Sequence, residues 1–368
     1  MTKPFLPNGS PLLPSVPRLL RWEPADTATA SALYEVFRAA HLADEPVEPP
    51  ESPGTHRSRL TGKWEGAAGE VWYLPGDAGE ARGSGETGGA GESSGTGGAV
   101  AYCRLDLPDL ENTDRALVGL YVHPAVRRRG LGRALLRHAV QRAAANGRAT
   151  LDGVALEDSA GEAFARSVGA TMGLETARQV QELRAVPPER VAELRAEAER
   201  EAAGYSLMTW NGPVPDEYAA CFAKVVNAFA DSPHAEGVQP EVWDADRIRQ
   251  RWGRLLREGH VRGYSIAALR EGTGEMAALT EVTIDPQVPQ WGRQRLTAVT
   301  RPHRGHRLGL LVKTAMMQWL AKAEPRLERI ETGNTVANDH MIAVNAALGY
   351  KVVHPSWKYY EMPVSAVG

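Results

Sequence analysis

Apolar residues recur at helical spacing in two stretches of the chain, 131–139 and 308–319, that share one local plan. Each stretch follows a short apolar run that ends in a proline, at residues 117–124 and 296–302. This pattern predicts a strand, a turn and an amphipathic helix in each half of the chain. The positions on the predicted helical faces are Leu131, Ala134, Leu135, His138 and Ala139 in the first copy, and Leu308, Leu311, Val312, Ala315, Met316 and Trp319 in the second.

The remaining apolar runs predict a similar order of elements in the two halves. In the first half we expect helices at 25–42, from 131 to 146, and at 160–168, with strands at 71–74, 99–105, 117–122 and 151–156. In the second half we expect helices at 216–229, 244–257, 306–322 and 339–348, with strands at 265–270, 276–284, 295–299, around 327–332, and closing strands to residue 362.

A length of 368 residues suits about two domains of ordinary size. Residues 1–17 are proline-rich and predict a disordered start, followed by an N-terminal domain over 18–186. Residues 76–98 hold ten glycines, so we expect a flexible loop inside that domain. A charged helix over 187–203 then links it to a C-terminal domain over 204–368.

The turn between strand and helix is the most informative part of the repeat. Residues 127–132 read Arg-Arg-Arg-Gly-Leu-Gly, and residues 304–309, placed 177 positions later, read Arg-Gly-His-Arg-Leu-Gly. Free amide groups and the positive end of the helix dipole meet at such a turn, and glycine lets the backbone approach a bulky phosphate. The duplicated turn therefore predicts a phosphate-bearing ligand.

These turns resemble the signature of the GCN5-related N-acetyltransferases (GNAT), Arg/Gln-x-x-Gly-x-Gly/Ala. Arg127, Gly130 and Gly132 match it, whereas in the second copy Arg307 replaces the central glycine. A later helix motif of the family, Asn-x-x-Ala-x-x-x-Tyr-x-x-x-Gly-Phe, is also matched in part in each half. The corresponding positions are Asp158, Gly161, Ala165, Gly169 and Ala170 in the first half, and Asn338, Met341, Asn345, Gly349 and Tyr350 in the second.

The resemblance implies an α/β (α+β) chain of two tandem GNAT-like domains, each a mixed, mostly antiparallel sheet flanked by helices. It implies direct transfer of an acetyl group from acetyl-CoA (coenzyme A) to a primary amine. In the family, the strand before the turn tracks the pantetheine and polarises the thioester. The residues that the resemblance assigns to coenzyme A are Val122, Arg127, Arg128, Gly130, Leu131 and Gly132 in the first half, and Val299, Arg304, Gly305, His306, Arg307, Leu308, Gly309 and Asn338 in the second.

For the general base, the family commonly uses a Glu from the central strands. Glu281 lies in an otherwise apolar predicted strand, where a carboxylate is costly to bury unless it is used. Asp106 has a comparable position in the first half, but Pro108 follows closely and favours a turn. The family's acidic tyrosine is replaced by Ala165 and Asn345, so Asn345, water, Tyr350 or a substrate group must serve near the leaving sulfur.

Charge, apolar runs and histidine spacing limit the classes of partner that we expect. A formal net charge of −3 gives no general attraction to nucleic acid, and no apolar run reaches the roughly 18 residues of a membrane span. The histidines lack metal-ligand spacing, so no metal is expected. Cys103 and Cys221 are interpreted as buried free thiols, which implies a cytoplasmic location.

The motifs of the two halves differ. The second keeps Glu281, Asn338 and Asn345, so the sequence assigns the chemistry to it, and a structural or ligand-holding role to the first half. A small-molecule or peptide amine is the expected acceptor, and its identity and the oligomeric state stay open. The alternative is a catalytically degenerate, coenzyme A-binding regulatory or scaffold protein.

Overall fold

The computed structural model describes residues 18–62, 68–76, 98–228 and 236–366, apart from 251, 253, 259 and 337. The expected disordered start at 1–17 lies outside these residues, as does nearly all of the expected loop at 76–98. The first half contains β1 (Leu20–Arg21), α1 (Thr27–Asp44), α2 (Pro53–Thr61), β2 (Ala68–Gly76), β3 (Gly98–Leu107), β4 (Arg115–Val122), α3 (Leu131–Ala145), β5 (Thr150–Leu156), α4 (Ala160–Ser167) and β6 (Thr171–Glu182). The second half contains α5 (Pro188–Glu201), β7 (Tyr205–Asn211), α6 (Ala219–Asn227), α7 (Ala245–Gln250), α8 (Arg254–Arg257), β8 (Arg262–Arg270), β9 (Met276–Ile284), β10 (Trp291–Val299), α9 (Leu308–Ala323), β11 (Arg329–Thr335), α10 (Asp339–Ala347) and β12 (Tyr350–Pro363).

The elements with the clearest periodicity form where the sequence predicts them. Helix α1 begins at Thr27 because the Asp26 carboxylate accepts the amide hydrogen of Thr29 at 2.9 Å. Strand β9 is buried along its whole length, which explains its nearly continuous apolar run. Propensity, capping and burial agree in these segments, so the prediction holds there.

The elements that the sequence analysis does not predict are polar or divided. Helix α2 buries Thr55, His56 and Ser58 rather than an apolar stripe, so it carries no helical periodicity to detect. Strands β6 and β7 were also not predicted. The single helix expected over 244–257 is instead two short helices, α7 and α8.

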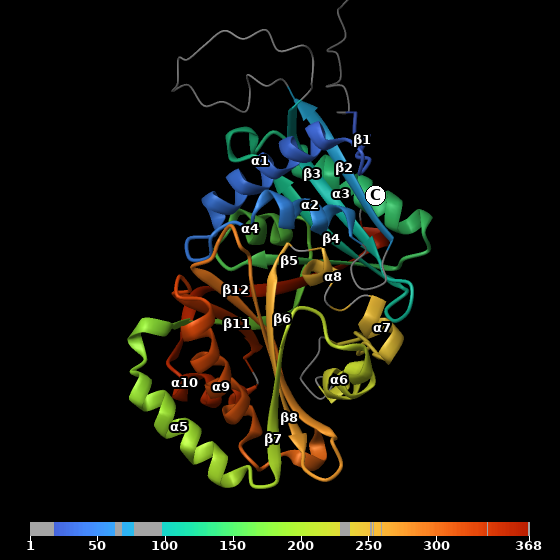
Figure 1. Cartoon of the computed structure of the whole chain (residues 1–368). Coiled ribbons are helices and arrows are strands. Elements are labelled where there is room, and N and C mark those ends of the chain that lie inside the picture. The colour runs from blue at the N-terminus through green and yellow to red at the C-terminus, as the bar shows by residue number, and fades with distance from the viewer. Residues whose placement is uncertain are drawn as a thin grey trace, which may run out of the picture.

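All twelve strands form one sheet in the order β1-β2-β3-β4-β5-β12-β6-β11-β10-β9-β8-β7 (Figure 1). The last strand of each half crosses to the other half. β12 pairs antiparallel with β5, and β6 pairs antiparallel with β11, while β6 and β12 pair with each other at the centre. The α/β class with a mixed sheet flanked by helices is thus confirmed, and the sheets of the two halves are continuous through exchanged strands.

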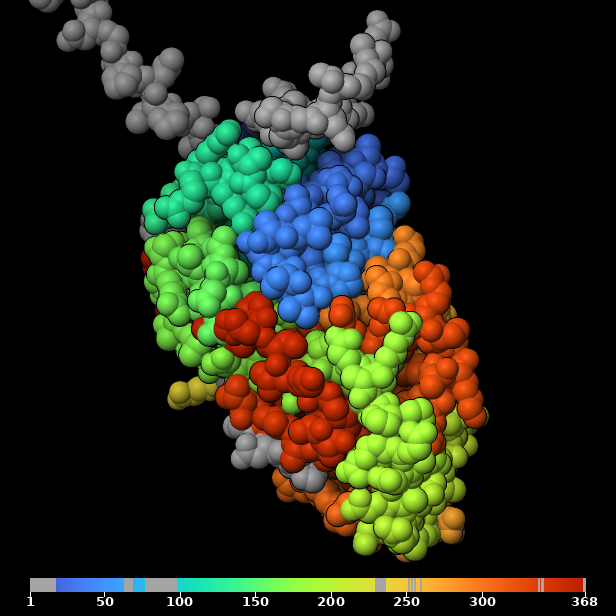
Figure 2. Space-filling view, turned by 90° about the vertical axis from the view of Figure 1, so that its left-hand side faces the viewer, coloured from blue at the N-terminus to red at the C-terminus, as the bar shows by residue number. Residues whose placement is uncertain are grey.

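The exterior shows the same exchange. In Figure 2 the red C-terminal segment lies against the green segment of the first half, and the blue N-terminal helices meet the orange segment of the second half. Polar contacts join the halves at this boundary. The fully buried Arg178 of β6 pairs with Glu45 of α1 and with Glu331 of β11, each at 2.8 Å.

Each half has a parallel strand pair that separates part of the way along. The pairing of β4 with β5 ends at Val118 and Gly153. The pairing of β10 with β11 ends at Arg293 and Glu331. The strands diverge in both halves, and the side chains near the divergence distinguish the two halves.

Candidate functional site

A cavity of about 1680 Å³ lies on the first half and is closed in part by the second. Its wall includes the diverging part of β4, the turn at 127–133 and the facing surface of α4. Residues 119–122 keep their pairing with β3 along one edge and line the cavity, beyond the point where β5 leaves them. The pantetheine-tracking strand that the sequence predicts at Val122 therefore opens onto this cavity.

The first glycine turn is shaped as an anion site. Gly130 has φ +84°, a left-handed conformation that favours glycine, and no side chain caps the start of α3 at Leu131. A Cβ atom at Gly132 would lie 3.3 Å from the Phe164 ring, so the position is tightly packed. Arg128, Gly130, Leu131 and Gly132, which the sequence assigns to coenzyme A, all line the cavity.

Arg127 also lines the cavity, but its guanidinium is held by protein groups. It binds the Asp44 carboxylate at 2.6 Å and 2.8 Å and donates to the Val122 carbonyl at 3.2 Å. The motif arginine thus ties the turn to the end of α1. Arg128 and Arg133 are the other arginines of the turn that line the cavity.

The second glycine turn is contacted on one side by the acidic helix α5, while residues 304–307 stay exposed. Arg307 adopts φ +52° where the first copy has Gly130, and its guanidinium binds the Glu197 carboxylate. His306 contacts the Glu201 carbonyl at 3.3 Å. The Glu197 carboxylate and the Glu201 carbonyl oxygen both carry negative charge or partial charge and would repel a phosphate here. Among the residues that the structure describes, the cavity wall includes neither Val299 nor any residue of 304–309.

Buried polar side chains form a cluster in the second half. The Lys313 ammonium, 3% exposed, donates to the side-chain amide oxygen (Oδ1) of Asn345 at 2.8 Å and lies 4.5 Å from the centre of the Tyr350 ring. Asn345, fully buried, donates to Gln179 of the exchanged strand β6 at 2.8 Å. Burial lowers the pKa of Lys313 to about 7.

The corresponding positions of the first half carry smaller or apolar side chains. Leu136, Ala165 and Ala170 stand where the second half has Lys313, Asn345 and Tyr350, and all three line the cavity. These apolar side chains line the cavity of the first half, whereas Lys313, Asn345 and Tyr350 are buried in the second half. Asn345, expected near the leaving sulfur, therefore serves packing in this structure, and Tyr350 is buried beside it.

Glu281 and Asn338 also have structural partners. Glu281 is 2% exposed and lies 3.4 Å from each of Arg295, Trp252 and Ser265. Arg295 and Trp252 line the cavity, so these two side chains separate Glu281 from it. Asn338 caps α10, where its side chain accepts the Met341 amide hydrogen at 3.3 Å.

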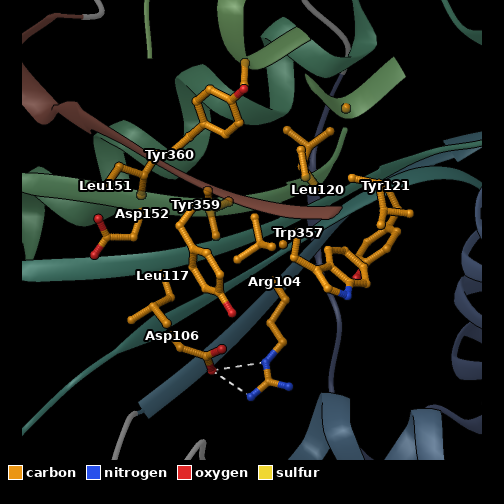
Figure 3. Close-up of a pocket in the computed structure, with 18 of the residues that line it drawn as sticks. Arg104, Asp106, Leu117, Leu120, Tyr121, Leu151, Asp152, Trp357, Tyr359 and Tyr360 are labelled. Atoms are coloured by element: carbon orange, nitrogen blue, oxygen red, sulfur yellow. Dashed lines mark hydrogen bonds and ion pairs between the residues drawn. The ribbon is translucent and has the colours of Figure 1, made fainter. Parts of the chain in front are cut away.

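Asp106 lies inside strand β3, so the expected turn at this position was wrong. The carboxylate is 8% exposed, lines the cavity, and is bound by Arg104 at 2.8 Å and 3.0 Å through one oxygen (Figure 3). Burial raises the pKa of Asp106, against the opposing charge of Arg104. A cavity-facing carboxylate with a raised pKa suits a general base.

The sequence analysis missed Tyr359 and Tyr360 on β12, which line the cavity of the other half together with Trp357. Figure 3 shows the Tyr359 hydroxyl pointing toward the Asp106–Arg104 pair. Burial raises the pKa of Tyr359, against a hydrogen bond with Thr176, so the phenol stays protonated at neutral pH. These aromatic residues reach the cavity of the first half because β12 is exchanged between the halves. No local sequence pattern predicts that exchange.

Comparison with known proteins agrees with this geometry. Residues 64–169 match the model of the acetyltransferase (GNAT) family. A tandem GNAT protein from the clavulanic acid biosynthesis pathway superposes with a TM-score of 0.75 at 26% identity, covering 94% of this chain and 98% of that one. A GCN5-related N-acetyltransferase from Sphaerobacter thermophilus gives a TM-score of 0.60 at 18% identity, covering 96% and 97%.

The chain belongs to the GNAT acetyltransferases, in their tandem form. No curated protein matches it. No helix among the described residues is long and apolar enough to cross a membrane. Within the same residues, no group of three or more His, Cys, Asp or Glu side chains could hold a metal ion.

Proposed function

We propose that the protein transfers an acetyl group from acetyl-CoA to a primary amine in the cavity of the first half. One observation carries the proposal: the open glycine turn, the diverging end of β4 and the Asp106 carboxylate all face a single cavity. The sequence favoured the second half for this chemistry. The proposal follows the cavity instead, because the second turn lies outside the cavity wall, its Arg307 is bound by Glu197 of α5, and the buried pair Lys313–Asn345 takes positions that are apolar in the first half.

Coenzyme A would enter with its pyrophosphate at the start of α3. The backbone amides near Gly130, Leu131 and Gly132, together with the charges of Arg128 and Arg133, supply an anion site there. The pantetheine would follow residues 119–122 of β4, whose edge toward β5 is open beyond Val118. The thioester would then lie near the divergence of the two strands.

The acceptor would attack from the face of the sheet that carries Asp106 and Tyr359. The Asp106 carboxylate would take a proton from the ammonium form of the acceptor, and the amine nitrogen would then form a bond to the acetyl carbon. The C–S bond breaks, and the thiolate takes up a proton from the Tyr359 phenol, which lines the cavity. The nitrogen, now bound to the acetyl carbon, loses its second proton, and that proton restores the phenol. The products are an N-acetylated amine and free coenzyme A.

Coenzyme A binding tests the assignment to the first half. In calorimetry, the chain should bind one coenzyme A per molecule. Gly132→Glu should abolish binding, because it adds bulk beside Phe164 and negative charge beside the pyrophosphate. The matched variant Gly309→Glu should leave binding within about twofold, since a Cβ atom there meets only Val299 at an ordinary 3.8 Å. Loss of binding in Gly309→Glu with normal binding in Gly132→Glu would place the coenzyme A site in the second half.

A second candidate is a coenzyme A-binding regulatory or scaffold protein without turnover. It is favoured by Ala165, which stands where the family carries its acidic tyrosine. Consumption of acetyl-CoA, measured against a panel of aromatic, aliphatic and peptide amines, separates the two candidates. Tight coenzyme A binding without acetyl transfer to any amine of the panel would favour the scaffold.

A further inference from the structure

Three large apolar side chains are exposed inside the cavity and form one patch. Leu117 is 36% exposed, Val154 50% and Tyr359 40%. Val154 and Tyr359 are directly opposed across β5 and β12, and Leu117 stands opposite Asp152 across β4 and β5. A contiguous exposed apolar patch within a concave wall is typical of a ligand site.

The second half adds aromatic residues to the same cavity. Trp243 and Trp252 line it, with their rings in edge-to-face contact at 5.3 Å, and Val226 lines it beside them. Arg295 covers the Trp252 ring at 4.8 Å. The acceptor space therefore has an apolar wall from each half.

Charged residues of the patch form a row across the strands. Asp106 pairs with Leu117, Leu117 with Asp152, and Asp152 with Glu361 in the register of β3, β4, β5 and β12. Arg104 neutralises Asp106, whereas Asp152 and Glu361 share the single guanidinium of Arg115, each at 2.6 Å. One end of the row thus carries one more negative charge than positive charge.

The neighbouring row adds aromatic and apolar surface. Gly119 lies opposite Arg104, and a Cβ atom there would lie 3.4 Å from the Tyr121 ring, while Val154 and Tyr359 continue the row on the far side of the diverging strands. An ammonium group held by the carboxylate row would therefore lie beside an apolar surface and near the open edge of β4.

We propose that the acceptor is a small primary amine attached to an aromatic or branched apolar body. The body packs on Leu117, Val154 and Tyr359, and the ammonium group is drawn to the excess carboxylate and deprotonated at Asp106. A polyamine fits less well, because it brings several positive charges to a row with one uncompensated carboxylate. The inference rests on the proposed function, since it names the acceptor of the same site.

Binding of defined amines to the protein saturated with coenzyme A tests this inference without requiring turnover. In calorimetry, 2-phenylethylamine should bind at least tenfold more tightly than spermidine or ethanolamine, because only the first buries a ring. Val154→Lys should weaken 2-phenylethylamine binding at least tenfold. Val352→Lys, at a 65% exposed position of β12 outside the cavity wall, should leave binding unchanged.

Tyr359→Phe provides a second variant that keeps the packing surface. It should bind 2-phenylethylamine as tightly as the native protein, whereas Tyr359→Ala should lose about tenfold. Equal or tighter binding of spermidine, or equal losses in Val154→Lys and Val352→Lys, would overturn the inference.

Turnover separates this inference from the proposed function. If 2-phenylethylamine binds as expected but no amine is acetylated, the apolar amine site stands and the enzymatic proposal falls. If amines are acetylated without preference for an apolar body, the enzymatic proposal stands and the acceptor inference falls.

Discussion

Asp106 is the side chain through which the proposed chemistry can be tested most directly. Asp106→Asn keeps the size of the side chain and removes its ability to accept a proton, so turnover should fall roughly 100- to 10,000-fold near neutral pH. Binding of coenzyme A should change much less, because the turn at 127–132 is untouched. The deficit should shrink at high pH, where free amine is abundant.

Glu281→Gln is the matched control for that substitution. Glu281 is buried behind Arg295 and Trp252, so its neutralisation should affect the rate only through the cavity wall, by about tenfold at most. Steady-state rates at several pH values measure both variants. A near-normal rate in Asp106→Asn together with a large loss in Glu281→Gln would return the general base to the second half.

The buried Lys313 predicts how the free energy of unfolding depends on pH. Burial places its folded-state pKa at about 7, below the ordinary lysine value of 10.5, so between these pH values the unfolded chain binds more protons. Native stability should therefore rise as pH increases from about 7 to about 10.5. In Lys313→Leu this rise should be reduced by up to about 5 kcal/mol, the equivalent of the shift from 10.5 to about 7. Denaturant unfolding at several pH values measures it, and an unchanged rise in the variant would contradict the buried-lysine explanation.

At the scale of elements, the decisive difference between the halves is which side chains lie near the divergence of the strands. In the second half, strand β6 brings Gln179 to Asn345, and Glu197 of helix α5 binds Arg307 of the second glycine turn. Strand β12 brings Trp357 and Tyr359 to the cavity of the first half. The exchanged strand β6 thus contributes to the buried polar cluster of the second half, and the exchanged strand β12 contributes to the cavity wall of the first half.

At the scale of the whole molecule, the exchanged strands predict that the halves depend on each other. Fragments 18–186 and 187–366, expressed separately, should lack the partners of β5, β6, β11 and β12 and should not melt cooperatively. Co-expressed, they should form a one-to-one complex that binds coenzyme A. The control is the whole chain cut after folding at a protease site inserted behind Val186, which should stay associated. A sharp thermal transition in either isolated fragment would contradict this dependence.

Much of the architecture was predictable because the information is local. The periodic helices α1, α3 and α9, the buried strands β3 and β9, and both glycine turns appear where the sequence places them. Helix α2 escaped prediction because its buried face is polar, and β6 because its role depends on partners more than a hundred residues away in β11 and β12.

By itself, the sequence indicated the GNAT resemblance, the duplication and the two glycine turns, because each depends on short motifs whose spacing is preserved along the chain. Only the tertiary structure decided which turn opens onto a cavity. A side chain such as Asn345 has the same chemistry whether it serves a substrate or packs against Lys313, and its neighbours from other strands settle which. Likewise, Asp106 became a candidate base because β3, β4 and the second half enclose it, and such enclosure has no signature in the linear sequence.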